Sequence, residues 1–413
     1  MSRKFPDNFI WGTATAGHQV EGNNSNSDTW FAENVKPSVF KEPSLMAANS
    51  WELWRKDIDL VAGMNLTAYR FSVEWARIEP QEGVFSEEAL AHYEAMVDYC
   101  HEKGLDALVT FNHFTAPHWF AAKSGWMHPD APKLFARYCE VVAKRIGHKI
   151  KAAVTLNEPN IARLLSWIGL PDFIAVLDRE TLDACSRDAG VEKYRLANVV
   201  LEEDREAIED GIAAGHVAGK AAIKAVCPEL PVGLSIALMH DVVVEGADPA
   251  IRDKKRRECY DRWFELAKHD DFVGVQNYET HLWDSNGLVR APEGANTNGM
   301  GSAIDPGSLA GAVKYAHEKT GVPVLITEHG LLVDEDAERQ KFIPIALGLL
   351  LDIMEAGVPV LGYTHWTLID NFEWIFGYEK KYGLHSFDTK TFERKAKGSA
   401  SVLAKIAGAN GLA

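Results

Sequence analysis

Several features are scarce or missing in this 413-residue sequence, and each absence narrows the possible functions. No apolar run approaches the roughly 20 residues that a membrane-spanning helix needs. Residues 1–8 carry no apolar stretch of the kind that a secretory leader contains, so we expect a cytoplasmic protein. Basic residues are outnumbered, with 43 Lys and Arg against 59 Asp and Glu and a formal net charge of -16. This balance argues against a nucleic acid or an anionic membrane as a partner.

Cysteine and cofactor motifs are equally sparse. The five cysteines are odd in number, widely spread and never in a Cys-x-x-Cys pair: Cys100, Cys139, Cys185, Cys227 and Cys259. We interpret them as reduced, mostly buried thiols. His113 and His118 have no convincing third ligand, so we expect no catalytic metal. The glycine-rich phosphate loops and the Gly-x-Ser-x-Gly elbow are also missing, and we expect no cofactor.

What the chain does contain is a regular alternation of apolar β-type runs and amphipathic helical stretches, typical of βα units on a parallel sheet. The expected strands cover residues 9–14, 68–72, 107–111, 152–156, 232–236, 272–275, 324–327 and 360–364. The expected helices cover residues 50–64, 86–103, 130–147, 206–226, 254–268, 308–320 and 336–356. Without a Ser/Gly-rich linker or an internal repeat, eight such units predict an α/β fold, a single (β/α)8 TIM barrel domain over residues 1–413.

Two connections between these units are too long for simple loops and should lie over the mouth of the barrel. Residues 160–205 contain apolar stretches and are expected to be helical, whereas residues 283–306 are rich in Gly, Asn and Pro and are expected to be irregular and mobile. Both follow strands whose ends carry candidate site residues. We therefore expect these connections to select the leaving group of a substrate.

Two glutamates, Glu158 and Glu328, each stand where a predicted strand ends, directly before a breaker or one residue from it (Pro159 and Gly330). An ionisable group at the carboxyl end of a buried strand is costly unless it has a function. Two carboxyl groups brought together there can cleave an acetal, because one attacks as a carboxylate and the other donates a proton. Taken singly, each glutamate is equally compatible with a surface carboxylate or a structural salt bridge.

Six motifs stand in one order along nearly the whole chain. They are Phe9 to Ala16 with Gln19 to Gly22, Tyr69 to Ser72, Asn112 to Phe114, Leu156 to Pro159, Ile326 to Gly330, and Trp366 to Trp374. Together they resemble glycoside hydrolase family 1, the β-glucosidase and β-glycosidase family. The resemblance implies a retaining β-glycosidase, most simply a β-glucosidase, that hydrolyses the non-reducing terminal β-linked sugar of small glycosides or oligosaccharides.

The resemblance also assigns chemical roles. It makes Glu158 the acid/base and Glu328 the nucleophile, with Arg70 and Tyr278 keeping Glu328 ionised. This agrees with the chemistry, since a proton donor needs a raised pKa and a nucleophile needs cationic or hydrogen-bonding neighbours. A retaining mechanism predicts carboxyl groups about 5 to 5.5 Å apart.

Sugar recognition needs planar donors and acceptors for vicinal hydroxyls and aromatic faces for the ring. The residues that match the family's hydroxyl-binding positions are Gln19, His113, Asn157, Glu373 and Trp374, while Trp366 matches its stacking platform and Tyr382 stands near the ring where Phe is common. A carboxylate at Glu373 would repel a phosphate dianion, so the resemblance implies an unphosphorylated sugar. Lys380 and Lys381 match an ordinary Lys-Arg pair of the family rather than phosphate ligands.

Several positions depart from the family pattern without removing a catalytic group. Gln276 stands where Asn is usual, Phe114 replaces a Trp, His329 replaces an Asn, and the segment after Met300 lacks a Trp on the aglycone side. They leave β-galactosides or β-fucosides as alternative substrates, and transfer to a sugar or alcohol acceptor as an alternative to hydrolysis. A rival interpretation from another class is a non-catalytic sugar-binding protein on the same barrel. The sequence does not set the oligomeric state.

Overall fold

The computed structural model describes residues 3–169 and 171–412. Met1 and Ser2, which belong to the segment in which the sequence predicts no leader, lie outside the described residues, as do Leu170 and Ala413.

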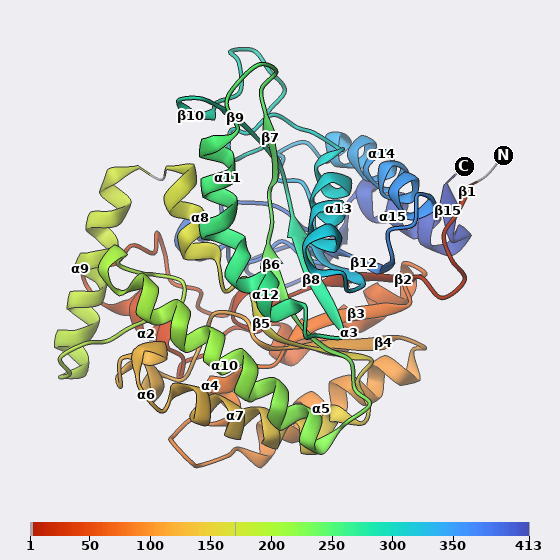
Figure 1. Cartoon of the computed structure of the whole chain (residues 1–413). Coiled ribbons are helices and arrows are strands. Elements are labelled where there is room, and N and C mark those ends of the chain that lie inside the picture. The colour runs from red at the N-terminus through yellow and green to blue at the C-terminus, as the bar shows by residue number, and fades with distance from the viewer. Residues whose placement is uncertain (1–2, 170, 413) are drawn as a thin grey trace.

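Eight parallel strands close into a barrel at the centre of the molecule (Figure 1). They are β2 (Ile10–Ala14), β3 (Ala68–Ser72), β4 (Asp106–Asn112), β5 (Ala152–Asn157), β6 (Val232–Ala237), β8 (Phe272–Asn277), β11 (Val324–His329) and β12 (Val360–Trp366). Each strand pairs with the next in chain order, and β12 pairs with β2 to close the barrel. The predicted (β/α)8 barrel is confirmed, with all eight strands at or within two residues of their expected positions.

The barrel strands are covered on both faces, which explains their nearly continuous apolar sequences. Every residue of β3, β5, β6, β8 and β11 is buried. Three of the polar residues in these strands, Asn157, Gln276 and Glu328, occupy the last two positions of β5, β8 and β11. Polar groups thus gather at the carboxyl ends of the strands, the end at which barrel enzymes place their sites.

Helices surround the barrel (Figure 1). Those that follow the expected pattern are α3 (Ser50–Gly63), α5 (Glu87–Glu102), α7 (Ala131–Val142), α10 (Arg205–Val226), α12 (Arg262–Ala267), α13 (Ser308–Thr320) and α14 (Asp336–Glu355). The remaining ones are α1 (Gly17–Val20), α2 (Asp28–Asn34), α4 (Trp75–Ile78), α6 (His118–Ala121), α8 (Ile161–Ile168), α9 (Asp172–Ala189), α11 (Ala250–Arg256) and α15 (Gly398–Ala409).

Two expected helices differ from the prediction because π-helical turns interrupt them. The helix expected over residues 130–147 is α-helical only to Val142 and continues as a π turn over Ala143–Gly147. The one expected over residues 254–268 begins earlier, at Ala250, and a π turn over Arg257–Asp261 separates α11 from α12. Such single turns are set by local packing rather than by composition.

The two long connections behave differently. Residues 160–205 contain α8 and α9, so the expected helical character is confirmed. The expectation of a wholly irregular 283–306 segment is wrong at its start, because β9 (Thr280–Asp284) and β10 (Gly287–Val289) form a hairpin that joins β7 (His240–Val243) in a small sheet. Asp284 closes the turn by accepting the backbone N–H groups of Asn286 and Gly287.

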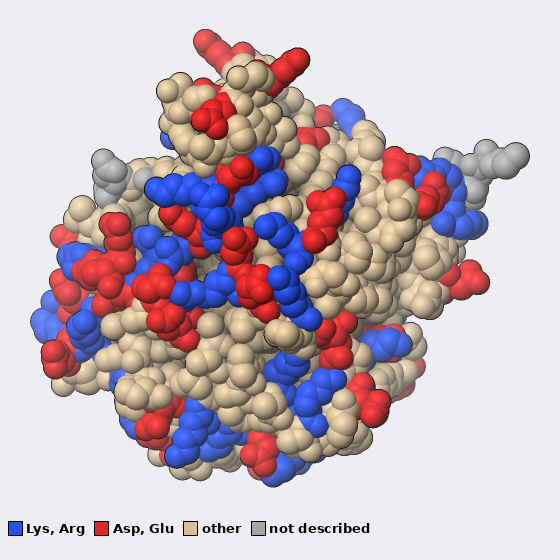
Figure 2. Space-filling view, in the orientation of Figure 1, with Lys and Arg blue, Asp and Glu red and all other residues tan. Residues whose placement is uncertain are grey.

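The chain ends lie side by side, since β1 (Arg3–Lys4) pairs with β15 (Gly411–Leu412). A separate two-stranded sheet is formed by β13 (His385–Phe387) and β14 (Arg394–Ala396). On the face shown in Figure 2, basic and acidic side chains are interspersed. Ion pairs also join neighbouring helices, for example Arg163 of α8 with Glu206 of α10. Among the described residues, no helix has the length and apolar character needed to cross a membrane.

Candidate active site

A pocket of about 210 Å³ lies at the carboxyl ends of the barrel strands. Nine of the predicted site residues line it: Gln19, His113, Glu158, Tyr278, Glu328, Trp366, Glu373, Trp374 and Tyr382. The other two, Arg70 and Asn157, are buried and hydrogen-bonded to one another, and Arg70 also contacts Glu328. The structure therefore brings all the predicted residues together, from the ends of barrel strands and from the segments that follow them.

Glu328 is held by three hydrogen-bond donors. Arg70 Nη1 donates to Glu328 Oε1 at 2.7 Å, and Gln276 Nε2 donates to the same oxygen at 2.9 Å. The hydroxyl of Tyr278 donates to Oε2 at 2.5 Å. Burial and the Glu328 charge raise the pKa of Tyr278 well above its usual value, so this hydroxyl keeps its proton and remains a donor.

Glu158 lies in a different setting. Its backbone adopts a φ of 42°, a left-handed conformation that is strained for a residue with a side chain and is typical of functional positions. Within the described residues, no donor forms a hydrogen bond with its carboxyl group. Burial raises the pKa of Glu158 well above its usual value, and the neighbouring Glu328 charge raises it further.

The two carboxyl groups therefore differ in how their proton is controlled. Burial raises the pKa of Glu328 as well, but the Arg70 charge and the hydrogen bonds from Tyr278, Arg70 and Gln276 oppose that rise. At Glu158 the charge of Arg70, which forms no ion pair with this carboxyl group, is the one influence among the described residues that lowers the pKa. When one proton is shared between the two groups, it resides on Glu158 and Glu328 carries the charge.

Two polar atoms beside the pocket are left free for a ligand. Asn157 Nδ2 donates to His113 Nε2 at 3.2 Å, and burial together with the Arg70 charge lowers the pKa of His113 well below its usual value. The neutral ring must then carry its proton on Nδ1, and that atom is buried without a partner among the described residues. Gln19 donates its Nε2 to the Phe372 carbonyl at 2.9 Å and leaves Oε1 buried and unpaired in the described part of the chain. A free donor and a free acceptor suit a hydroxylated ligand.

Glu373 is the third carboxyl group of the pocket. Gln19 Nε2 lies 3.3 Å from its Oε2, and its pKa is raised to about 8 by burial and by the Glu328 charge. Glu373 can therefore act as a donor or as an acceptor toward sugar hydroxyls around neutral pH.

Gln276 is the site residue that the sequence analysis noted only as a departure. Besides Glu328, its Nε2 reaches Asn157 Oδ1 at 2.6 Å, which also accepts from Arg70 Nη2 at 2.6 Å. The sequence could have indicated this role, because Gln276 stands two residues before Tyr278 and alternate residues along a strand share a face. Other pocket residues that the sequence did not single out as ligands are Phe114, Ile161, Leu165, Asn198, Met300, Ile375, Phe376 and Lys380.

A second cavity, of about 450 Å³, adjoins the first. The two share the lining residues Met300, Phe376 and Lys380. The second cavity extends between the end of α8 and the β9–β10 hairpin, so both long connections border it. The Lys380 ammonium group donates a hydrogen bond to the Gly299 carbonyl, with 3.0 Å between Nζ and the oxygen. This contact links Lys380 to the loop before α13.

No group of three His, Cys, Asp or Glu side chains suited to a metal ion occurs in residues 3–169 and 171–412. The ionisable groups that line the pocket include the carboxyl groups of Glu158, Glu328 and Glu373.

Comparisons with known proteins agree with this geometry. The family model described as glycosyl hydrolase family 1 matches residues 1–172 and 265–412. β-Glucosidase A of Thermotoga maritima is 27% identical over 452 residues, covering 99% of each chain. Among solved structures, β-glycosidase BGL167 is 41% identical with a TM-score of 0.91, covering 99% of this chain and 98% of that one. An apo structure of a β-glucosidase, 1317, is 34% identical with a TM-score of 0.92, covering 97% and 98%. The family predicted from the six motifs is confirmed: this chain belongs to glycosyl hydrolase family 1 and is a retaining glycosidase.

Proposed function

We propose that this protein hydrolyses terminal β-glucosides, with Glu328 as the nucleophile and Glu158 as the acid/base. The observation that carries the proposal is the unequal setting of the two carboxyl groups. Glu328 accepts from Arg70, Gln276 and Tyr278, whereas Glu158 has no hydrogen-bond donor among the described residues and its pKa is raised well above the usual value. These are the protonation states that the first step of a double displacement requires.

In the first step, the Glu328 carboxylate attacks the anomeric carbon and the bond to the aglycone oxygen breaks. The proton of Glu158 moves to that oxygen, so the aglycone leaves as a neutral alcohol. In the second step, water gives a proton to Glu158 and attacks the same carbon, which releases Glu328. Two inversions give net retention, and a sugar or alcohol in place of water would give transglycosylation.

The glucose preference is supported by relatives and by the pocket. Several similar proteins carry the name β-glucosidase, and one from Bifidobacterium breve, 26% identical over 467 residues, is a bifunctional β-D-glucosidase/β-D-fucosidase. β-Fucosides and β-galactosides are therefore the alternative substrates to test. Glu373 supports an unphosphorylated sugar, because a carboxyl group, whether protonated or ionised, offers no positive charge to a phosphate dianion. The second cavity gives the aglycone room beyond the sugar.

A 2-fluoro β-glucoside with a good leaving group tests the proposal directly. Fluorine at C2 slows both steps and the good leaving group speeds only the first, so the ester should accumulate on Glu328 and be found by peptide mass spectrometry. A Glu328→Gln variant is the matched control and should stay unlabelled. Label on another residue would overturn the role of Glu328, and binding without any label or turnover would favour the sugar-binding alternative.

We also expect the enzyme to work in the cytoplasm. The five cysteines are free thiols, four of them buried, which suits a reducing compartment.

A further inference from the structure

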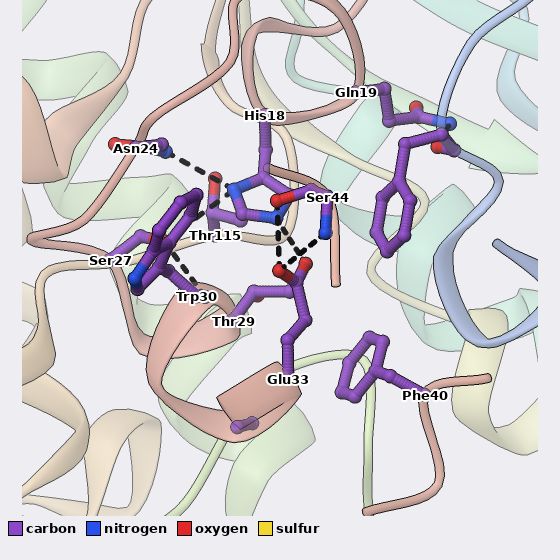
Figure 3. Close-up of polar contacts among 12 residues, drawn as sticks. His18, Gln19, Asn24, Ser27, Thr29, Trp30, Glu33, Phe40, Ser44 and Thr115 are labelled. Carbon is purple, nitrogen blue, oxygen red and sulfur yellow. Dashed lines mark hydrogen bonds and ion pairs between the residues drawn. The ribbon is translucent and has the colours of Figure 1, made fainter. Parts of the chain in front are cut away.

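The short helix α1 contacts the sugar-binding loop, which carries Phe372, Glu373 and Trp374, through two neighbouring side chains. Gln19 reaches the loop by hydrogen bonds to Phe372 and Glu373. His18, the preceding residue, points away from Gln19 (Figure 3). Its imidazole lies nearly parallel to the Trp374 indole, with 5.8 Å between ring centroids and 7° between the planes. This is an offset-stacked geometry of the kind that aromatic pairs prefer.

His18 is itself fixed in a buried polar cluster. Its Nε2 donates to Glu33 Oε1 at 2.7 Å, and Glu33 Oε2 accepts from both the backbone N–H and the hydroxyl of Ser44, at 2.9 and 2.8 Å (Figure 3). On the other side of the ring, Asn24 Nδ2 lies 3.3 Å from Nδ1. His18 and Glu33 are 1% and 3% exposed, so solvent does not compete with these bonds.

The cluster packs against Trp374, whose backbone conformation is unfavourable. Trp374 has a φ of 51°, in the left-handed region that is unfavourable for a residue with a side chain. Its indole also lies nearly parallel to the His113 ring and edge-on to Phe114. No hydrogen bond of the indole N–H occurs within the described residues, which leaves it available to a sugar hydroxyl. Packing against neighbouring rings is therefore what holds this donor in place.

We propose that His18 is a positioning residue that sets the angle of the Trp374 indole in the sugar pocket, with Glu33 and Ser44 holding the imidazole. The inference rests on the proposed function, because it takes Trp374 as a sugar-binding residue. It adds that recognition depends on a buried histidine which does not line the pocket.

The test is a double-mutant cycle with His18→Gln and Trp374→Ala. A glutamine can still donate to Glu33 but presents no flat ring, so it separates stacking from the stability of the cluster. Misplacing a substrate-binding group has a large effect on rate, and we expect His18→Gln to lower kcat/KM for an aryl β-glucoside about tenfold, mainly through KM. In the Trp374→Ala background the same change should cost less than about twofold, because its effect passes through the indole.

The ratio of kcat/KM for β-glucoside and β-galactoside provides a second readout. It should change in His18→Gln, since the hydroxyl donor has moved. His216→Gln is the matched control: His216 is also buried, contacts Thr155 through Nδ1 and lies 3.3 Å from Asp270 through Nε2, yet does not line the pocket. It should leave both kcat/KM and the sugar ratio within about twofold of the wild type.

Two outcomes would overturn the inference: an equal loss in both backgrounds, or an unchanged sugar ratio. If His18→Gln fails to fold, His18→Phe and His18→Ala replace it in the same cycle. Both lose the donor to Glu33, but His18→Phe retains a flat ring beside Trp374, so its loss of kcat/KM should be the smaller one. A wild-type enzyme without glucosidase activity would contradict the proposed function instead, so the two failures are distinguishable.

Discussion

The two glutamates share a pocket but meet opposite surroundings. Glu328 lies on the side formed by β3, β8 and β11, where Arg70 and Gln276 fix one carboxylate oxygen. Glu158 lies on the side bordered by α8, whose Ile161 offers the pocket only an apolar surface. Identical side chains thus become a charged and a protonated group because hydrogen-bond donors offset the burial of Glu328, whereas Glu158 has no such donor among the described residues.

Removing the charged member should have the largest effect. Glu328→Ala should lower kcat for an aryl β-glucoside by about 10⁴-fold or more, because the carboxylate that attacks the anomeric carbon is gone. Adding azide to the variant should restore part of the turnover and give an α-glycosyl azide, which NMR identifies. A loss of less than about tenfold would contradict the assignment.

Removing the protonated member should have an effect that depends on the leaving group. Glu158→Gln should lower kcat/KM about 10³-fold for an alkyl β-glucoside but only a few-fold for a dinitrophenyl β-glucoside, whose oxygen needs no proton. The pKa of Glu158 is raised and its protonated form is the active one, so wild-type activity is lost as pH rises through that pKa. The alkaline limb of the kcat/KM profile should therefore disappear in Glu158→Gln. Equal losses for both substrates would contradict the role of Glu158.

The barrel was predictable because its strands carry strong local signals. β3 and α13 begin and end at the residues expected from the sequence, since apolar runs and helical periodicity identify them. α15 was missed because Gly398–Ala409 consists largely of small residues, and α1 because four residues show no periodicity. These elements form through tertiary packing, which outweighs local propensity.

The site was predictable in its motifs but not in its supporting contacts. The positions of Glu158 and Glu328 at strand ends could be inferred from neighbouring residues alone. The hydrogen bond of Gln276 to Glu328 joins residues 52 apart, and that of His18 to Glu33 joins residues 15 apart with no periodic relation. Such contacts depend on the register of the closed barrel and on loop packing, which a single sequence does not encode locally.

Weakening the support of Glu328 should bring the two carboxyl groups closer in behaviour. Gln276→Leu removes a hydrogen bond to a carboxylate, worth about 1.5 to 3 kcal/mol, so we expect kcat/KM to fall about 10- to 100-fold. Gln276 favours the ionised form of Glu328 and lowers its pKa, so its loss raises that pKa and activity should fail at a higher pH on the acid side.

The alkaline limb of the same variant is the internal control, because it reports Glu158. A shift of that limb with an unchanged acid limb would show that Gln276 acts on the other carboxyl group.

Changes on the entrance side should have the smallest effect and should depend on the aglycone. Phe376 lines both cavities, so Phe376→Ala should raise KM about three- to tenfold for a large apolar aryl β-glucoside, through lost contact area. β-Glucosyl fluoride fills only the sugar site and should be turned over with KM within about twofold of wild type. Steady-state kinetics with the two substrates separates the sides of the pocket. An equal rise in KM for both would mean that Phe376 supports the sugar site, and that the second cavity is not where the aglycone binds.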